Sequence, residues 1–149
     1  MLNRALEKEP YNVEGLMALG GMMAELNKWE EAEALFRDAI TEKPDFAEAY
    51  HNYGAYLHLK GDIPRAVQFY QKAYSIDTEK TVSMVNAARG LRQIGKLEDA
   101  YSVLSLVLDQ RRQMDALDVL GLVYFQMGKL TESVSLYEEL QREHPSNIC

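Results

Sequence analysis

Two histidines, His51 and His58, are the residues whose type and spacing first suggest metal chemistry. They stand seven apart, and seven residues of helix rise about 10 Å. Metal-binding histidines on one helix normally stand four apart, so one ion cannot reach both side chains. The single cysteine, Cys149, rules out a disulfide framework and a zinc site built from thiolates. We therefore expect no metal and no cofactor, and histidines that are solvated or line a surface.

Other arrangements that could support catalysis are equally weak. The pair Gly20–Gly21 lies inside a predicted helix and does not follow a strand, so it does not indicate a phosphate-binding loop. The carboxylate pairs Glu30–Glu31 and Glu138–Glu139 are predicted to lie on exposed helix faces. No Ser-His-Asp or Cys-His set can be nominated. The sequence thus predicts no catalytic residue and no enzyme in this segment.

Asn52 and Asn86 suggest a different function, because they stand 34 residues apart at what proves to be one repeat position. An asparagine amide both donates and accepts hydrogen bonds, so a ladder of such residues can bind the backbone of a peptide whatever its sequence. The alternative is that asparagine simply fills an exposed helix position.

Arg89 and Arg92 form a second candidate binding element. Their spacing places both on one helix face, where they could receive a carboxylate or a phosphate from a ligand. The alternative, which we favour slightly, is that Asp115 and Asp118 on a later helix neutralise them.

A period of 34 residues organises the chain. Small residues recur at this interval, followed by a final step of 33, and so do the residues between the two predicted helices of each unit. The small-residue series are Gly20, Gly54, Ala88 and Gly121, and Ala32, Ala66, Ala100 and Ser133; the turn series is Asn27, Gly61, Gly95 and Gly128. Glycine, and next asparagine, tolerates the left-handed backbone that ends a helix. Small side chains allow paired helices to approach closely. The pattern predicts an all-α fold of helix–turn–helix units.

The units are predicted at residues 13–46, 47–80, 81–113 and 114–147, with residues 1–12 as the last helix of a preceding unit that ends near Pro10. We expect Pro44 and Pro145 to stop helices and Pro64 to lie in a first turn. All units are expected to form one solenoid domain.

The units resemble the tetratricopeptide repeat (TPR), whose first helix carries a bulky residue, Leu, Gly and Tyr and whose second carries Ala, Phe, Ala and Pro. The first unit supplies Leu16, Leu19, Gly20, Met23, Ala32, Phe36, Ala39 and Pro44. The second supplies Tyr50, Tyr53, Gly54, Leu57, Ala66, Tyr70, Ala73 and Thr78. The third, which is short, departs most, with Ala88 and Val107 in place of Gly and Ala. The resemblance implies a right-handed α-solenoid of four full repeats plus one preceding helix.

The same resemblance implies a concave groove lined by the first helices. The groove positions give a predicted peptide-binding surface of His51, Asn52, Asn86, Arg89, Arg92, Val119, Leu122 and Phe125. The last three form an apolar strip, which is either an anchor for a ligand or a face that packs on a following repeat. The carboxylate clamp that holds chaperone C-terminal tails is not expected, because only its middle asparagine is matched.

Composition limits the classes of partner. The 149 residues are 47% hydrophobic and 26% charged, with a formal net charge of −7. An acidic chain without a basic stripe is a poor candidate for nucleic-acid binding. No apolar stretch is long enough to span a bilayer, and the N-terminus lacks the apolar core of a signal peptide. We expect a cytoplasmic protein without membrane insertion.

The leading hypothesis is a protein–protein interaction scaffold that binds an extended peptide or partner segment in the concave groove. One alternative is the substrate-selecting arm of a larger glycosyltransferase, as the resemblance allows. Solenoid ends without polar caps indicate a piece of a longer array, which we favour, or association with another copy, so another alternative is a self-assembling structural module that forms homo-oligomers through these ends.

Overall fold

The computed structural model describes residues 12–143, which form eight helices and no strand. The predicted all-α fold is confirmed. The predicted helix over residues 1–12 and the predicted stop at Pro145 lie outside the described residues, apart from Asn12. The chain divides into two compact units, with the boundary between Lys80 and Thr81, and each is described by itself.

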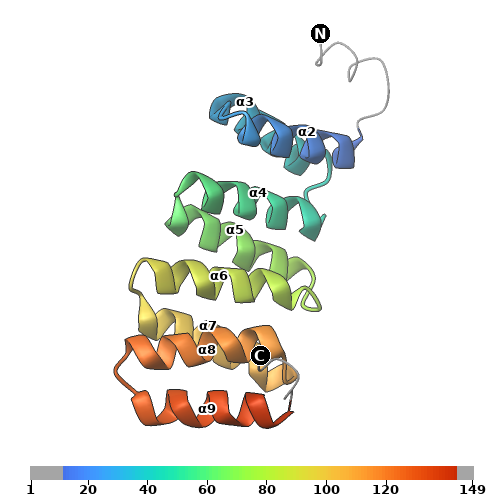
Figure 1. The fold of residues 1–149 in the computed structure, drawn as a ribbon. Helices are drawn as coiled ribbons and strands as arrows, with labels where there is room; N and C mark the ends of the chain where they lie inside the picture. Colours follow the sequence, from blue (N-terminus) through green and yellow to red (C-terminus); the bar gives the residue numbers. More distant parts are fainter. Residues whose placement is uncertain (1–11, 144–149) are drawn as a thin grey trace. The chain divides into compact units, whose positions relative to one another are not determined.

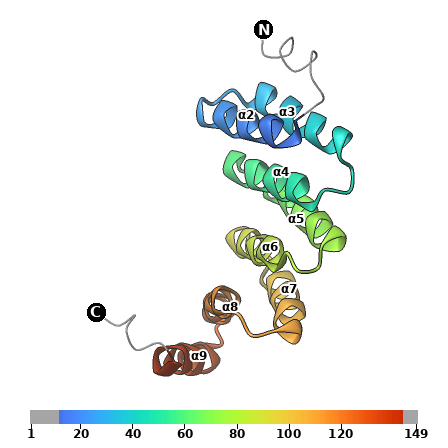
Figure 2. The same cartoon turned by 90° about the vertical axis from the view of Figure 1, so that its right-hand side faces the viewer.

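The first unit holds two helix pairs (Figure 1). Its helices are α2 (Val13–Glu25), α3 (Trp29–Glu42), α4 (Ala47–Lys60) and α5 (Ile63–Ile76). The second unit also holds two pairs, and Figure 2 shows each pair lying side by side. Its helices are α6 (Thr81–Gln93), α7 (Leu97–Gln110), α8 (Met114–Gln126) and α9 (Leu130–Glu143).

The turn within each pair has the predicted left-handed residue. The φ angle is 61° at Asn27, 99° at Gly61, 81° at Gly95 and 83° at Gly128. Each of these residues ends the first helix of a pair and returns the chain along the second. The prediction made from the turn series is confirmed.

Helix ends follow the local chemistry of the sequence. The side chain of Asn12 accepts a hydrogen bond from the Gly15 amide at 3.1 Å and caps the start of α2. Pro64 lies in the first turn of α5, where a missing N–H is tolerated. Helix α3 ends at Glu42, two residues before Pro44.

The small residues bring paired helices close against aromatic rings. A Cβ atom added to Gly20 would lie 2.9 Å from the Phe36 ring, and one added to Gly54 would lie 3.0 Å from the Tyr70 ring. These approaches are closer than a side chain normally tolerates. The predicted packing role of the glycines is therefore confirmed.

The third repeat solves the same packing problem differently. Ala88 takes the glycine position, and Leu104, sixteen residues later, takes the position of the aromatic ring. Both side chains are fully buried. An extra Cβ on one helix is thus accompanied by a narrower side chain on the other, so the pair keeps its close packing.

Within residues 12–143, no helix has both the length and the apolar character needed to cross a membrane.

Candidate functional site

Asn52 lies half-buried on α4 and contacts the neighbouring first helix of its unit. Its Nδ2 atom donates to the Met17 sulfur on α2 at 3.3 Å. A thioether is a weak acceptor. The contact orients the amide and leaves a weak interaction that a better acceptor on a ligand would replace.

His51 precedes Asn52 and is also half-buried, with its ring 5.4 Å from that of Tyr70. Burial lowers the pKa of His51, the positive charge of Lys80 lowers the pKa further, and Glu48 acts in the opposite direction. The imidazole is therefore neutral at pH 7 and carries no positive charge.

In the second unit, Arg89 and Arg92 are oriented by amides. Arg89 Nη1 donates to Asn86 Oδ1 at 2.9 Å on the same helix. Arg92 Nη1 donates to Gln126 Oε1 at 2.7 Å, so this bond links α6 to α8. The Nε atom of Arg92 is buried and has no hydrogen-bond partner. Neither guanidinium is held by a carboxylate within the described residues.

The favoured pairing of these arginines with Asp115 and Asp118 is therefore wrong. Both aspartates are exposed on α8 and form no ion pair within the described residues, whereas the arginines reach uncharged amide oxygens. Asp118 instead contributes its backbone carbonyl, which accepts from the Tyr137 hydroxyl at 2.9 Å.

The apolar strip on α8 is only partly as expected. Val119 is 2% exposed and belongs to the core of its unit, so its prediction as a surface residue is wrong. Its side chain has no polar atom to keep in water, and burial removes its apolar area from solvent. Leu122 is half-buried and Phe125 is 59% exposed, so these two remain available at the surface.

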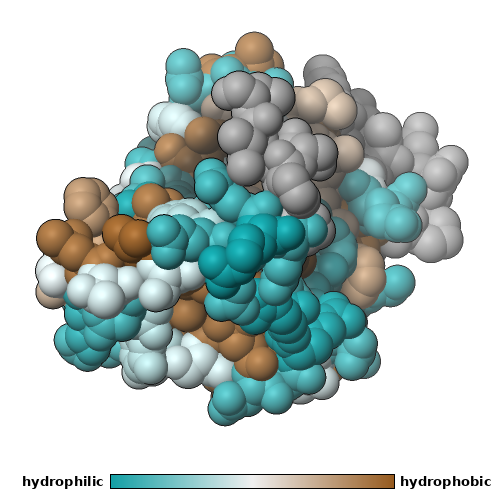
Figure 3. Space-filling view, turned by 60° about the horizontal axis from the view of Figure 1, so that its bottom comes forward, coloured by the Kyte–Doolittle hydropathy of each residue, from teal (hydrophilic) through white to brown (hydrophobic). Residues whose placement is uncertain are grey.

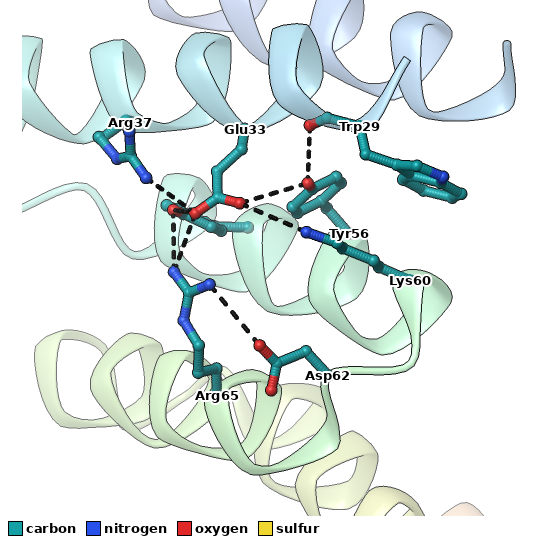
Figure 4. A network of polar contacts seen from close by, with 8 residues as sticks. Trp29, Glu33, Arg37, Tyr56, Lys60, Asp62 and Arg65 are labelled. Carbon is teal, nitrogen blue, oxygen red and sulfur yellow. Dashed lines mark hydrogen bonds and ion pairs between the residues drawn. The ribbon is translucent and has the colours of Figure 1, made fainter. Parts of the chain in front are cut away.

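The sequence analysis missed Glu33, which is the centre of a polar network between α3 and α4 (Figure 4). Its carboxylate is 13% exposed and accepts from Arg37, Tyr53 and Arg65 at 2.9, 2.9 and 3.0 Å. Lys60 lies 3.8 Å away. These groups come from α3, α4 and α5, so one carboxylate connects the first two repeats.

Tyr56 supports the same junction. Its hydroxyl donates to the Trp29 carbonyl at 2.8 Å and lies 3.4 Å from Glu33. Its ring packs 6.1 Å from Trp29 and 5.3 Å from Phe36. Arg65 also pairs with Asp62 at 3.6 Å, which fixes the guanidinium from a second side. We assign this network a structural role at the junction, because protein groups occupy it.

The network shifts the ionisation of its members. Burial alone would raise the pKa of Glu33, but hydrogen bonds from Arg65 and Tyr53 and the charges of Arg65 and Arg37 hold that pKa below its ordinary value. Burial, followed by the negative charge of Glu33, raises the pKa of Tyr56 to about 12. At pH 7 the network thus contains a carboxylate and neutral phenols.

Alkaline unfolding should report on Tyr56. Its pKa rises from 10.0 in the unfolded chain to about 12 in the fold, so its contribution to stability is complete below pH 10 and is lost as the pH rises towards 12. Tyr56→Phe should therefore reduce the loss of unfolding free energy over this interval, measured by urea denaturation. Tyr50→Phe, outside the network, is the control. If the free energy of unfolding falls with pH equally steeply in Tyr56→Phe and in the wild type, the raised pKa of Tyr56 does not contribute to alkaline unfolding.

The described residues contain no group of three or more His, Cys, Asp or Glu side chains able to hold a metal ion. The arrangement that remains for function is a set of hydrogen-bonding, cationic and apolar side chains on first helices. Such a set suits binding.

Comparison with known proteins agrees with the repeat pattern. A model of the tetratricopeptide repeat matches residues 1–45 and 24–80, and a second such model matches residues 115–147. A search of curated proteins finds no match.

Several solved structures share the fold. A crystal structure of MamA has a TM-score of 0.81 at 20% identity, covering 97% of this chain and 85% of that one. A tetratricopeptide repeat protein from Parabacteroides merdae scores 0.83 at 19% identity, covering 98% and 59%. A thermophilic TPR protein of Thermus thermophilus scores 0.73 at 17% identity, covering 98% and 81%. At these identities the likeness concerns the fold alone.

Proposed function

Because the chain belongs to the tetratricopeptide repeat family, we propose that it is a non-catalytic scaffold that binds an extended segment of a partner protein along the first helices of its repeats. Proteins built from such repeats are interaction scaffolds in general, since stacked repeats offer extended binding surfaces. The finer proposal concerns which side chains bind and what they recognise.

The observation that carries the proposal is the surface shared by α6 and α8. Arg89 and Arg92 are held by amide oxygens and keep their charge free of carboxylates in the described part of the chain. Phe125 is exposed on α8, next to Gln126, which accepts from Arg92. Two arginines and an exposed aromatic ring on the first helices of one unit suit a segment that carries a carboxylate and a bulky apolar residue.

The first unit would contribute backbone recognition. Asn52 makes only a weak bond to a sulfur atom, so its amide can exchange that bond for a peptide carbonyl. A segment bound to the first unit is recognised chiefly through its main chain, whereas a segment bound to the second unit is selected by the arginines there.

Peptide selection followed by calorimetry tests this division. Peptides selected from a random library on the whole chain should be enriched in Asp or Glu close to an aromatic or aliphatic residue. Arg89→Ala with Arg92→Ala should lower the affinity for the selected peptide by about tenfold to a hundredfold, the loss expected when charge-assisted hydrogen bonds are removed. Asn52→Ala with Asn86→Ala should weaken it by about tenfold. The melting temperature should stay nearly constant in the Asn variants.

Arg142→Ala provides the matched control, because it removes an exposed cation from the second helix α9. Selected peptides that lack acidic residues would contradict the assignment to Arg89 and Arg92. If Arg142→Ala weakens peptide binding as much as Arg89→Ala with Arg92→Ala does, the loss reflects the net charge of the protein and not a specific site.

A further inference from the structure

The half-buried arginines of the described repeats have two kinds of partner. In the first unit, Arg65 pairs with the carboxylates of Glu33 at 3.0 Å and Asp62 at 3.6 Å. In the second unit, Arg89 and Arg92 are also half-buried but form no ion pair within the described part of the chain. Partial burial removes water from a guanidinium group, and a carboxylate offsets that cost better than a neutral oxygen does. The partners of the second pair are therefore not those that stability alone would favour.

A carboxylate lies in the same region as Arg92 and is not used. Burial raises the pKa of Tyr137 to about 12 together with the negative charge of Asp118, whereas the positive charge of Arg92 acts against the rise. Both charges therefore act on the same hydroxyl. Even so, Arg92 forms no ion pair with Asp118 in the described residues and donates to Gln126 Oε1 at 2.7 Å. A neutral partner is present although a charged group lies nearby.

The amides of Asn86 and Gln126 each hold one guanidinium at one atom. Asn86 Oδ1 accepts from Arg89 Nη1 at 2.9 Å within α6, and Gln126 on α8 holds Arg92 across the two helices. A guanidinium only donates hydrogen bonds, so the amide oxygen, and not the amide nitrogen, must face it. Each amide thus orients a guanidinium without neutralising its charge.

The fold does not require an amide at either position. Gln126 is the last residue of α8, and Glu25 is the last residue of α2 at the same position of the first repeat. A glutamate is therefore accommodated at this place in the same chain. At the position of Asn86, the first and fourth repeats carry Ala18 and Val119. The repeat architecture tolerates other side chains there, so it does not by itself explain the two amides.

We propose that Asn86 and Gln126 are specificity-determining residues of the surface shared by α6 and α8: they orient Arg89 and Arg92 through neutral oxygens and so keep this surface selective for an acidic segment. The inference rests on the proposed function and adds the groups that set the sign of the ligand's charge. Figure 3 brings the α9 side forward and shows apolar surface among hydrophilic surface there, so the polarity of the surface as a whole selects no ligand. Fixed charges have to do so.

Carboxylates of the same shape as the amides test the proposal. The probes are an acidic peptide selected on the wild-type chain and its counterpart with Asn for Asp and Gln for Glu. The wild type should prefer the acidic peptide by about tenfold or more. Gln126→Glu and Asn86→Asp should each reduce this preference severalfold, and the two together should bring it close to one, because the new carboxylates compete with the ligand for the arginines. Gln126→Ala should retain more of the preference, since it leaves Arg92 charged. Calorimetry on the whole chain measures each affinity.

Thermal unfolding gives a second readout that needs no ligand. Gln126→Glu should change the melting temperature more favourably, by about 1–4 °C, when Arg92 is present than in Arg92→Ala, because only Arg92 pairs with the new carboxylate. This comparison cancels the unfavourable effect of a negative charge at the end of a helix. A residue with a merely structural role would not weaken binding and strengthen this coupling in one substitution.

Gln141→Glu is the matched control, because it makes the same change at an exposed position of α9, and it should leave the peptide preference unchanged. If Arg89→Ala with Arg92→Ala removes the preference but Gln126→Glu and Asn86→Asp keep it, the proposal is overturned and the proposed function stands. A preference that survives the arginine substitutions, or a selection that yields no acidic peptide, overturns both. A preference reduced equally by Gln141→Glu reflects net charge and overturns the proposal as well.

Discussion

Glu33→Ala should lower the free energy of unfolding by about 2–3 kcal/mol, a large effect for a side chain that is only partly buried. The carboxylate accepts from three side chains on three helices, and its removal leaves the buried hydroxyl of Tyr53 without that acceptor. The exposed arginines can turn to water, which limits the loss. The melting temperature measured by circular dichroism should fall by about 5–10 °C.

Glu31→Ala on the same helix is the control, since Glu31 is exposed and its loss should change the free energy by less than about 0.5 kcal/mol. Glu33→Gln should lie between the two, because an amide oxygen still accepts but carries no charge. If Glu33→Ala and Glu31→Ala had the same melting temperature, the network would have no stabilising role at the junction.

Gly20→Ala should destabilise the first unit by about 1–3 kcal/mol, although alanine is the better helix former. The new methyl group would lie 2.9 Å from the Phe36 ring, and this ring is buried between Tyr53 and Tyr56. The ring cannot move away without disturbing both neighbours. Urea denaturation followed by circular dichroism measures the loss.

The third repeat supplies the compensating change. Because Ala88 is paired there with Leu104, adding Phe36→Leu to Gly20→Ala should recover part of the loss, with a favourable coupling of about 1 kcal/mol or more. Phe36→Leu alone should destabilise, since it leaves the space that the ring filled. Additive effects of the two substitutions would show that the glycine and the ring do not share one packing constraint.

The fold could be predicted from sequence because its signals are local or strictly periodic. Asn27 and Gly61 mark turns through their own backbone preference, and the structure gives both a left-handed φ. Gly20 and Gly54 mark close helix pairs because each stands at a fixed distance from an aromatic residue. Such features need no knowledge of distant contacts.

The site could be predicted only in part, because repeat position does not decide which atom a side chain reaches. Val119 shares a repeat position with Asn52 and Asn86, but without a polar group it is buried while they remain half-exposed. Arg92 was expected to meet an aspartate and reaches Gln126 instead. A long arginine has several acceptors within reach, and packing selects among them.

Glu33 was missed for a related reason. Its place among polar residues of α3 is typical of a solvated face, and its partners Tyr53 and Arg65 lie 20 and 32 residues away in sequence. The one signal available was the cluster of Tyr53 and Tyr56 opposite it, whose hydroxyls need acceptors once buried. That need appears only when the two repeats are placed in contact.

The single tryptophan of the chain, Trp29, lies at this same junction, with its ring 6.1 Å from Tyr56 and its carbonyl bound by the Tyr56 hydroxyl. The tryptophan emission of the protein, excited selectively over that of tyrosine, therefore originates at the contact between the first two repeats and carries no direct signal from the second unit. Fluorescence and helical ellipticity observe different parts of the molecule. The unfolding curves from the two probes coincide only when the second unit unfolds together with that junction. Comparing the two curves therefore tests whether the whole chain unfolds cooperatively.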